Sequence, residues 1–242
     1  MRSIALLKKT ASLAVLPLTL MLGTPSVHAF SGQGTVTVDG GKTTLDLAPA
    51  FFNIFPSLGA SLTQYQPAKL QGTLNNQNLR VTFPLATGTL NPGRPQPEIG
   101  FYDLQHRGGL NLYSPGTNYA VVMNTFELHN SSSCFAASPC LELGVTVTVN
   151  GKVLGHASNF AQNTGAITSF PLKNGVVKID NVPLFLTATG ATLMNQFFGL
   201  LPGGPLYLQE GFSLGTLYVK GTGARVICPP NTEYSASQQR CR

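Results

Sequence analysis

Short runs of alternating polar and apolar residues, separated by glycine-containing turns, restrict the fold more than any other feature of the sequence. Residues 35–38 and 43–47 alternate on either side of Asp39-Gly40-Gly41, which predicts a β-hairpin. Two further hairpins are predicted at Asn150-Gly151 and Asn174-Gly175, because an Asn-Gly pair readily takes the positive φ angles of a type I′ turn. A chain of short strands and tight turns predicts an all-β fold.

Two segments depart from this pattern. Residues 49–55 and 189–200 carry apolar side chains at helical spacing, and in the second segment Leu193, Phe197 and Leu200 share one face. We expect each segment to form a short helix that covers an end of the β core. All-β chains of this length are commonly one domain. The sequence therefore predicts a single β-sandwich or barrel-like domain with one or two short helices.

The first 29 residues have the layout of a secretory signal peptide. Arg2, Lys8 and Lys9 precede an uncharged apolar run over 11–22, and a small-residue cleavage site follows at 27–29. The run is shorter than the roughly 20 apolar residues of a membrane-spanning helix, and no later segment is long and apolar enough to span a bilayer. We expect a cleaved leader over 1–29, a β domain over 30–222, a tail over 223–242, and a secreted or periplasmic product.

Charge argues against nucleic acid as a partner. The formal net charge is +6, but three of the basic residues lie in the leader, so its removal leaves +3. The remaining Lys and Arg residues are scattered singly from Lys42 to Arg242, whereas a nucleic-acid binder gathers them on one patch. Mild positive charge is compatible with simple solubility or with an anionic small ligand.

The four cysteines form two short pairs in the sequence, Cys134 with Cys140 and Cys228 with Cys241. In an oxidising compartment an even count indicates disulfides. Four cysteines allow three connectivities, of which we favour the two local pairs. Neither pair has the C-x-x-C spacing of a zinc site.

No motif predicts an enzyme. Gly211-Phe212-Ser213-Leu214-Gly215 matches G-x-S-x-G, but a nucleophile elbow lies between a strand and a helix and has its histidine later in the chain. No histidine follows His156. His106, His129 and His156 are too far apart in sequence to share a helix turn or a strand face, so the spacing favours separate histidines over a metal site.

Several short motifs occur in a fixed order along the chain: 83–88 (FPLATG), 106–110 (HRGGL), 124–128 (NTFEL), 147–151 (VTVNG), 186–195 (LTATGATLMN) and 211–219. In this order the chain resembles, over about 34–219, the HtaA-type domain of secreted bacterial haem-uptake proteins. The resemblance implies a β-rich fold and haem held by a tyrosine with a nearby histidine. The histidine motif maps onto His106.

The tyrosine of that family falls in the aromatic segment 50–55, which here contains phenylalanine and no tyrosine. Phenylalanine has no donor atom for iron, whereas a phenolate binds ferric iron directly. Tyr65 is the nearest substitute, so the resemblance predicts His106 and Tyr65 as metal ligands. Arg107 is the candidate partner of a haem propionate. The alternative reading of His106 is a strand-end residue held by hydrogen bonds.

Two functions follow from these observations. The first is a secreted or periplasmic binding protein of HtaA-like fold that takes haem, or another hydrophobic anion, in iron acquisition. The second is a structural or surface-interaction β module without a small-molecule ligand. A concave apolar pocket would favour the first function, and a fully packed interior would favour the second.

Overall fold

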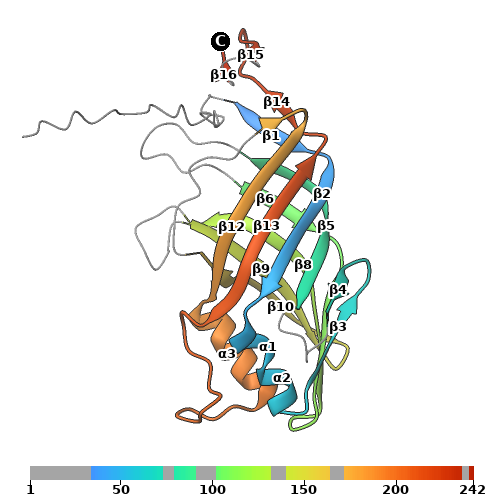
Figure 1. The fold of residues 1–242 in the computed structure, drawn as a ribbon, viewed down its shortest axis with the longest axis vertical. Helices are drawn as coiled ribbons and strands as arrows, with labels where there is room; N and C mark the ends of the chain where they lie inside the picture. Colours follow the sequence, from blue (N-terminus) through green and yellow to red (C-terminus); the bar gives the residue numbers. More distant parts are fainter. Residues whose placement is uncertain (1–33, 73–78, 91–101, 132–139, 164–171, 236–239) are drawn as a thin grey trace, which may run out of the picture.

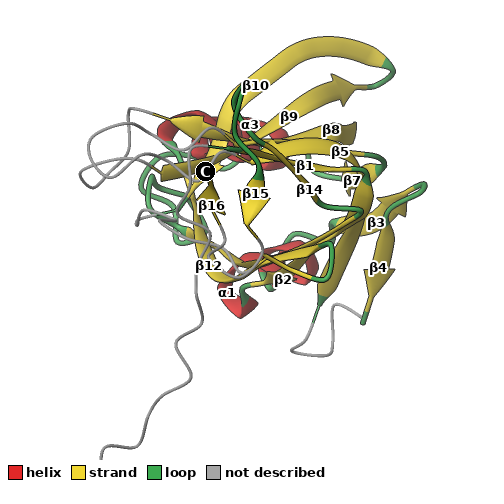
Figure 2. Cartoon of the chain, turned by 90° about the horizontal axis from the view of Figure 1, so that it is seen from above, coloured by secondary structure: helices red, strands yellow, loops and turns green. Residues whose placement is uncertain are grey.

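A closed eight-stranded barrel forms the body of the molecule in a computed structural model, which describes residues 34–72, 79–90, 102–131, 140–163, 172–235 and 240–242 (Figures 1 and 2). Every pairing between neighbouring strands of the barrel is antiparallel. The ring runs through β5 (Arg80–Leu90), β2 (Gly40–Leu47), β13 (Ser213–Thr222), β12 (Val176–Leu186), β10 (Lys152–Gln162), β9 (Cys140–Val149), β8 (Tyr119–Ser131) and β6 (Tyr102–His106), which pairs again with β5. The predicted all-β domain is confirmed in its barrel form.

Shorter strands extend the sheet outside this ring. β7 (Gly109–Ser114) pairs with β8 and carries β3 (Ser61–Tyr65) on its other side. The remaining short strands are β1 (Thr35–Val38), β4 (Lys69–Gln71), β11 (Leu172–Lys173), β14 (Arg225–Ile227) and the separate pair β15 (Tyr234–Ser235) and β16 (Arg240–Cys241).

Alternating side chains fill the barrel interior. Along β2 the residues Thr43, Leu45 and Leu47 are buried, while the side chains between them are partly exposed. Strand residues two apart face the same side of a sheet, so each strand contributes every second side chain to the core. An eight-stranded barrel has room for these side chains or for one small ligand.

Both predicted Asn-Gly turns are confirmed. Asn150 and Gly151 join β9 to β10 with φ angles of 47° and 80°, and Asn174 and Gly175 join β11 to β12 with φ angles of 52° and 69°. Positive φ at both central positions is the signature of a type I′ turn.

The hairpin predicted around Asp39 is wrong. β1 and β2 do not pair with each other; both pair with β5, in one continuous register in which Val38 faces Gly88 and Lys42 faces Pro84. Residues 35–47 therefore form one long strand that bends at 39–41. Gly41 has a φ of 126°, and glycine allows a bend within a strand as readily as a turn between strands.

Three short helices lie together at one end of the barrel (Figure 1). α1 (Pro49–Phe52) and α2 (Ile54–Ser57) come from the first predicted segment, and α3 (Ala188–Phe198) comes from the second. The rings of Phe55 and Phe198 meet edge to face at 5.3 Å, so the two segments cover the same end. None of the helices in the described residues has the length and apolar character needed to cross a membrane.

One predicted disulfide is present. Cys228 and Cys241 are bonded and close the small hairpin of β15 and β16. Cys134 lies outside the described residues, and so does the predicted leader. β14 pairs with β1, so three residues of the segment expected to be a tail belong to the sheet.

Candidate functional site

His106 lies inside the barrel rather than in an open cleft. Its side chain is at the end of β6, and the residue is 5% exposed. The Nε2 atom lies 2.6 Å from the Thr43 hydroxyl and the Nδ1 atom lies 3.0 Å from the Phe126 carbonyl oxygen. Because a carbonyl can only accept, Nδ1–H donates to Phe126 and Nε2 accepts from Thr43.

Burial lowers the pKa of His106 to about 4, an effect that the hydrogen bond to Phe126 partly opposes. The imidazole is therefore neutral at physiological pH, and both of its nitrogens are engaged. The iron-ligand role of His106 stays a prediction, and in this geometry it would require the ring to give up its bond to Thr43.

Tyr65 and Arg107 lie on the outer surface. Tyr65 is the last residue of β3, is 42% exposed, and lies on the strand face opposite to the buried Leu62. Arg107 is exposed directly after β6, where its backbone N–H donates to the Pro84 carbonyl. The roles of both residues in ligand binding stay predictions, because neither side chain lines the cavity found in the structure.

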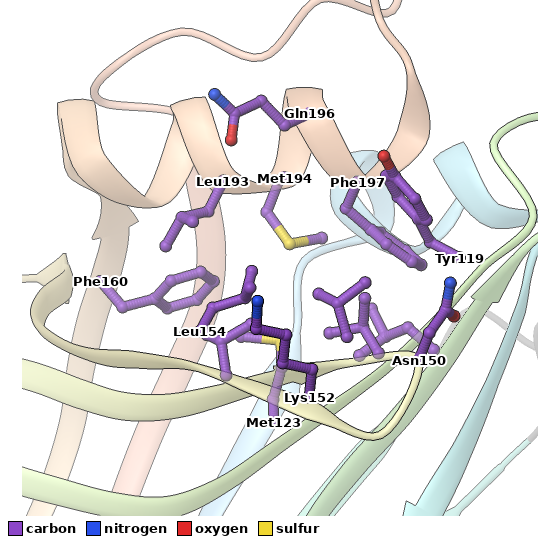
Figure 3. Close-up of a pocket in the computed structure, with 14 residues that line it drawn as sticks. Tyr119, Met123, Asn150, Lys152, Leu154, Phe160, Leu193, Met194, Gln196 and Phe197 are labelled. Carbon is purple, nitrogen blue, oxygen red and sulfur yellow. The ribbon is translucent and has the colours of Figure 1, made fainter.

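An apolar cavity of about 680 Å³ lies between α3 and the inner face of the sheet (Figure 3). Known ligand pockets occupy roughly 300–1,000 Å³ and combine mostly apolar walls with a few polar groups. The lining residues are Leu112, Tyr119, Val121, Met123, Val147, Val149, Asn150, Lys152, Leu154, Phe160, Leu193, Met194, Gln196 and Phe197. This cavity is the candidate ligand site.

Helix α3 forms the roof of the cavity. Leu193 and Met194 point from the helix towards the strands, whereas Gln196 turns away from them (Figure 3). The Thr187 hydroxyl caps the helix by accepting from the Gly190 N–H, and Gly199 ends it with a φ of 68°. These two caps fix the length of the roof.

The loop after α3 is tied to the helix by Asn195. Its side-chain amide donates to the Leu208 carbonyl at 2.8 Å and accepts from the Leu208 N–H at 2.9 Å. Asn195 is buried, and a fully paired amide at a buried position rigidifies its surroundings. Asn195 therefore fixes the loop after α3 against the helix.

The floor of the cavity is the inner face of β8 and β9 together with the irregular strand β10. The pairing of β10 with β9 shifts register between Val153 and Gly155 and again between Ala157 and Ala161. Leu154 lines the cavity and is still 60% exposed. An apolar side chain this exposed at a cavity wall leaves one side of the cavity open to solvent.

Besides Gln196, three polar side chains supply chemistry to this apolar cavity. The Tyr119 hydroxyl lies beside Phe197 at one end (Figure 3), and Tyr119 is 40% exposed. Lys152 adds one positive charge and Asn150 an amide whose oxygen accepts from the Ala120 N–H. The site thus offers a phenol oxygen that can bind iron, a cation that can pair with a carboxylate, and the thioethers of Met123 and Met194.

Sequence reasoning missed most of this site. It identified Leu193 and Phe197 as one face of a helix, but no spacing relates them to Tyr119 or Lys152, which reach the cavity from β8 and β10. The G-x-S-x-G segment proves to lie at the start of a strand, since Ser213 opens β13. A nucleophile elbow would instead lead into a helix.

The fold is similar to that of the C-terminal domain of HtaA from Corynebacterium glutamicum, known from a crystal structure. The TM-score is 0.50 at 12% sequence identity, and the match covers 77% of this chain and 98% of that domain. No protein-family model and no curated protein matches the sequence. The resemblance found in the ordered motifs therefore extends to the fold.

Proposed function

We propose that this protein binds a large apolar ligand carrying an anionic group, with haem as the first candidate, in the cavity beneath α3. The observation that supports this proposal most directly is the cavity itself. It has the volume of a ligand site, an apolar lining and a lysine at its wall. Similarity to a domain of HtaA supports the haem candidate through the fold alone.

Residues of the cavity fit the chemistry of haem better than the pair predicted from sequence. Tyr119 is partly exposed and lines the cavity, whereas His106 is enclosed and Tyr65 lies elsewhere. Bound haem would supply a ferric iron, for which a phenolate oxygen is a suitable ligand. Lys152 would pair with a propionate, and Met123, Met194 and Phe160 would pack against the macrocycle.

Hemin titration of the purified protein tests this proposal. We expect a shifted Soret band that saturates at one hemin per chain, and a change in its position or affinity for Tyr119→Phe. Tyr113→Phe is the matched control, because Tyr113 is 43% exposed on the neighbouring strand β7 and does not line the cavity. Tyr65→Phe tests the ligand predicted from sequence.

The contrary outcomes are distinct. If no Soret shift develops, haem is not the ligand; if the band responds to Tyr65→Phe but not to Tyr119→Phe, the cavity is not the haem site. If a long-chain fatty acid displaces a fluorescent apolar probe where hemin does not, the cavity takes a hydrophobic anion of another kind.

Export is part of the same proposal. A binding protein for haem in iron acquisition acts outside the cytoplasm, and residues 1–29 have the layout of a leader. N-terminal sequencing of the protein recovered from the periplasm or medium should begin at Phe30. Recovery of the uncleaved chain from the cytoplasm would contradict export.

The second candidate is a structural or surface-interaction module that has kept the scaffold without its ligand. The observation that favours it is His106, because both imidazole nitrogens hold the barrel together through Thr43 and Phe126. Under this function neither hemin nor a fatty acid would bind.

A further inference from the structure

Exposed apolar side chains gather around the open side of the cavity. Leu201 is 76% exposed and Val153 is 62% exposed. We call the three segments 113–120, 149–155 and 199–208 the rim. Most of the large apolar and aromatic side chains that are exposed in the described residues lie on it: Tyr113, Tyr119, Val153, Leu154 and Leu201.

Hydrogen bonds join the segments of the rim to one another. The Thr117 hydroxyl donates to the Phe197 carbonyl at 2.8 Å, which ties the first segment to the end of α3. The Ala120 N–H donates to Asn150 Oδ1 at 2.8 Å, and the Asn150 N–H donates to the Ala120 carbonyl at the same distance. The rim is therefore one continuous surface rather than three separate loops.

The rim surrounds the entrance of the cavity. Tyr119, Lys152 and Leu154 belong to the rim and also line the cavity (Figure 3). Leu201 and Val153 do not line it. Their side chains therefore add apolar surface around the entrance without forming part of the cavity wall.

Charged side chains are almost absent from the rim. Its three segments contain one charged residue, Lys152, and no aspartate or glutamate. At the opposite end of the barrel, Asp39 pairs with Arg225, and Glu233 exchanges backbone hydrogen bonds with Arg242 (Figure 1). A surface with a cation and no carboxylate is attracted to an anionic surface.

We propose that the rim docks on a phospholipid bilayer with anionic headgroups, and that the cavity exchanges its apolar ligand with that bilayer. Apolar side chains that enter the boundary between headgroups and acyl chains bind in proportion to the apolar area they bury. Leu201, Val153 and Leu154 supply this area. Lys152 attracts anionic headgroups, and tyrosine is enriched at this depth because its ring is apolar and its hydroxyl is polar.

The composition of the rim favours a bilayer over a protein partner. The energetic centres of protein interfaces are enriched in tryptophan, tyrosine and arginine, whereas leucine and valine are under-represented. The most exposed side chains of the rim are leucine and valine, and its segments contain no arginine. The exchange of ligand rests on the proposed function, but the docking does not.

Co-sedimentation of the purified protein, recovered after export, with vesicles tests the docking. Without added hemin, we expect binding to vesicles of equal parts phosphatidylcholine and phosphatidylglycerol. The affinity should be about 10-fold lower in Leu201→Asp and in Val153→Asp, since each change removes apolar area that docking buries. Ile227→Asp is the matched control, because Ile227 is 57% exposed on β14 at the opposite end (Figure 1).

The role of Lys152 is tested with the lipid composition. Lys152→Gln should weaken binding to these vesicles about 5-fold, because it removes a cation beside an anionic surface. Binding to vesicles of phosphatidylcholine alone should not change. An equal loss on both kinds of vesicle would contradict an anionic headgroup as the partner of Lys152.

The sequence contains no tryptophan, which permits a second readout. Leu201→Trp introduces a single indole, whose emission should shift to shorter wavelength and be quenched by brominated lipid when vesicles are added. Ile227→Trp places the same reporter at the opposite end, where we expect neither change. Circular dichroism verifies that each variant is folded.

The contrary outcomes are specific. Absence of vesicle binding, or binding that survives both aspartate changes, overturns the proposal. A dimer in solution that Leu201→Asp separates would also overturn it, since a second copy would then cover the rim. A protein that binds vesicles but no hemin would keep the docking and refute haem as the ligand.

Discussion

The two faces of the sheet formed by β8, β9 and β10 have opposite chemistry. The inner face lines an apolar cavity with Val121, Met123 and Val147. The outer face carries two histidine–glutamate pairs, His129 with Glu142 and His156 with Glu127. Strand residues alternate between faces, so both surfaces are encoded in the same three strands. The same strand can therefore line an apolar cavity with one face and carry polar side chains on the other.

A bulge in β8 makes this separation possible. Val121 and Met123 face inwards, but strict alternation would then bring Glu127 and His129 inwards as well. The register shifts by one residue between Asn124 and Glu127, so Phe126 takes the inward position and Glu127 the outward one. Bulges commonly redirect side chains next to functional sites.

The largest expected effect is a loss of stability at low pH that comes from His106 on the inner side. The folded pKa of His106, about 4, lies below the usual 6.5, so between these values the unfolded chain binds the proton and the folded chain does not. Stability is therefore lost as pH falls from about 6.5 towards 4, by about 3 kcal/mol in total. Urea unfolding at pH 7 and pH 4 measures the loss, and His106→Gln should lack this part of it. An equal loss in the variant would contradict the assignment.

The next effect sharpens the comparison from the outer side. Gly144→Ala places a methyl group against Glu127 and His156, and we expect this overpacking to lower the free energy of unfolding by roughly 1–3 kcal/mol while hemin affinity is unchanged. Gly116→Ala is the control, since a Cβ there would meet nothing within 4 Å. A loss of hemin affinity that accompanies the loss of stability would show that the two faces are not independent.

A smaller effect is expected on the inner side. Lys152→Met keeps the length of the side chain but removes its charge, and we expect hemin binding to weaken by about 0.5–1 kcal/mol at low salt. High salt should abolish the difference, because it screens exposed charges. Lys178→Met, on the exposed side of β12, should change nothing. An unchanged affinity in Lys152→Met at low salt would remove the anionic group from the description of the ligand.

The smallest effect concerns the bulge itself. Thr125 has a φ of 50°, a left-handed conformation that costs a side chain with a Cβ roughly 1–2 kcal/mol, whereas glycine pays about 0.5–1 kcal/mol in entropy. Thr125→Gly should therefore raise the free energy of unfolding by about 0.5 kcal/mol in urea titration. Thr63→Gly, in the ordinary strand β3, should lower it. A loss in both variants would mean that Thr125 is not strained.

Sequence patterns predicted the strands, turns and helices of this fold better than they predicted which strands pair with each other. The Asn150-Gly151 turn and the helix containing Leu193 follow from local rules, because φ preferences and helical spacing act within a few residues. The bend at Gly41 could not be told from a hairpin, since glycine permits both and β5 decides between them. Strand pairing depends on segments that are distant in sequence, so the residues of one strand alone do not identify its partner.

The sites were predicted less well for the same reason. The spacing of His129 and His156 did not reveal that both contact Glu127, because that contact depends on the pairing of β9 with β8 and with β10. His106 was correctly placed at a strand end, but its enclosure by Thr43 and Phe126 depends on the closed barrel. Cys134, which was predicted to pair with Cys140, lies outside the described residues.

The hairpin closed by Cys228 and Cys241 lies at the end of the barrel opposite to the helices (Figure 1). Gly34, which opens the described part of the chain, lies against the Cys241 sulfur. Both extremities of the domain thus meet at the pole remote from the cavity. A tether or fusion attached through either one would therefore hold the protein by the end remote from the cavity and leave the cavity end facing outwards.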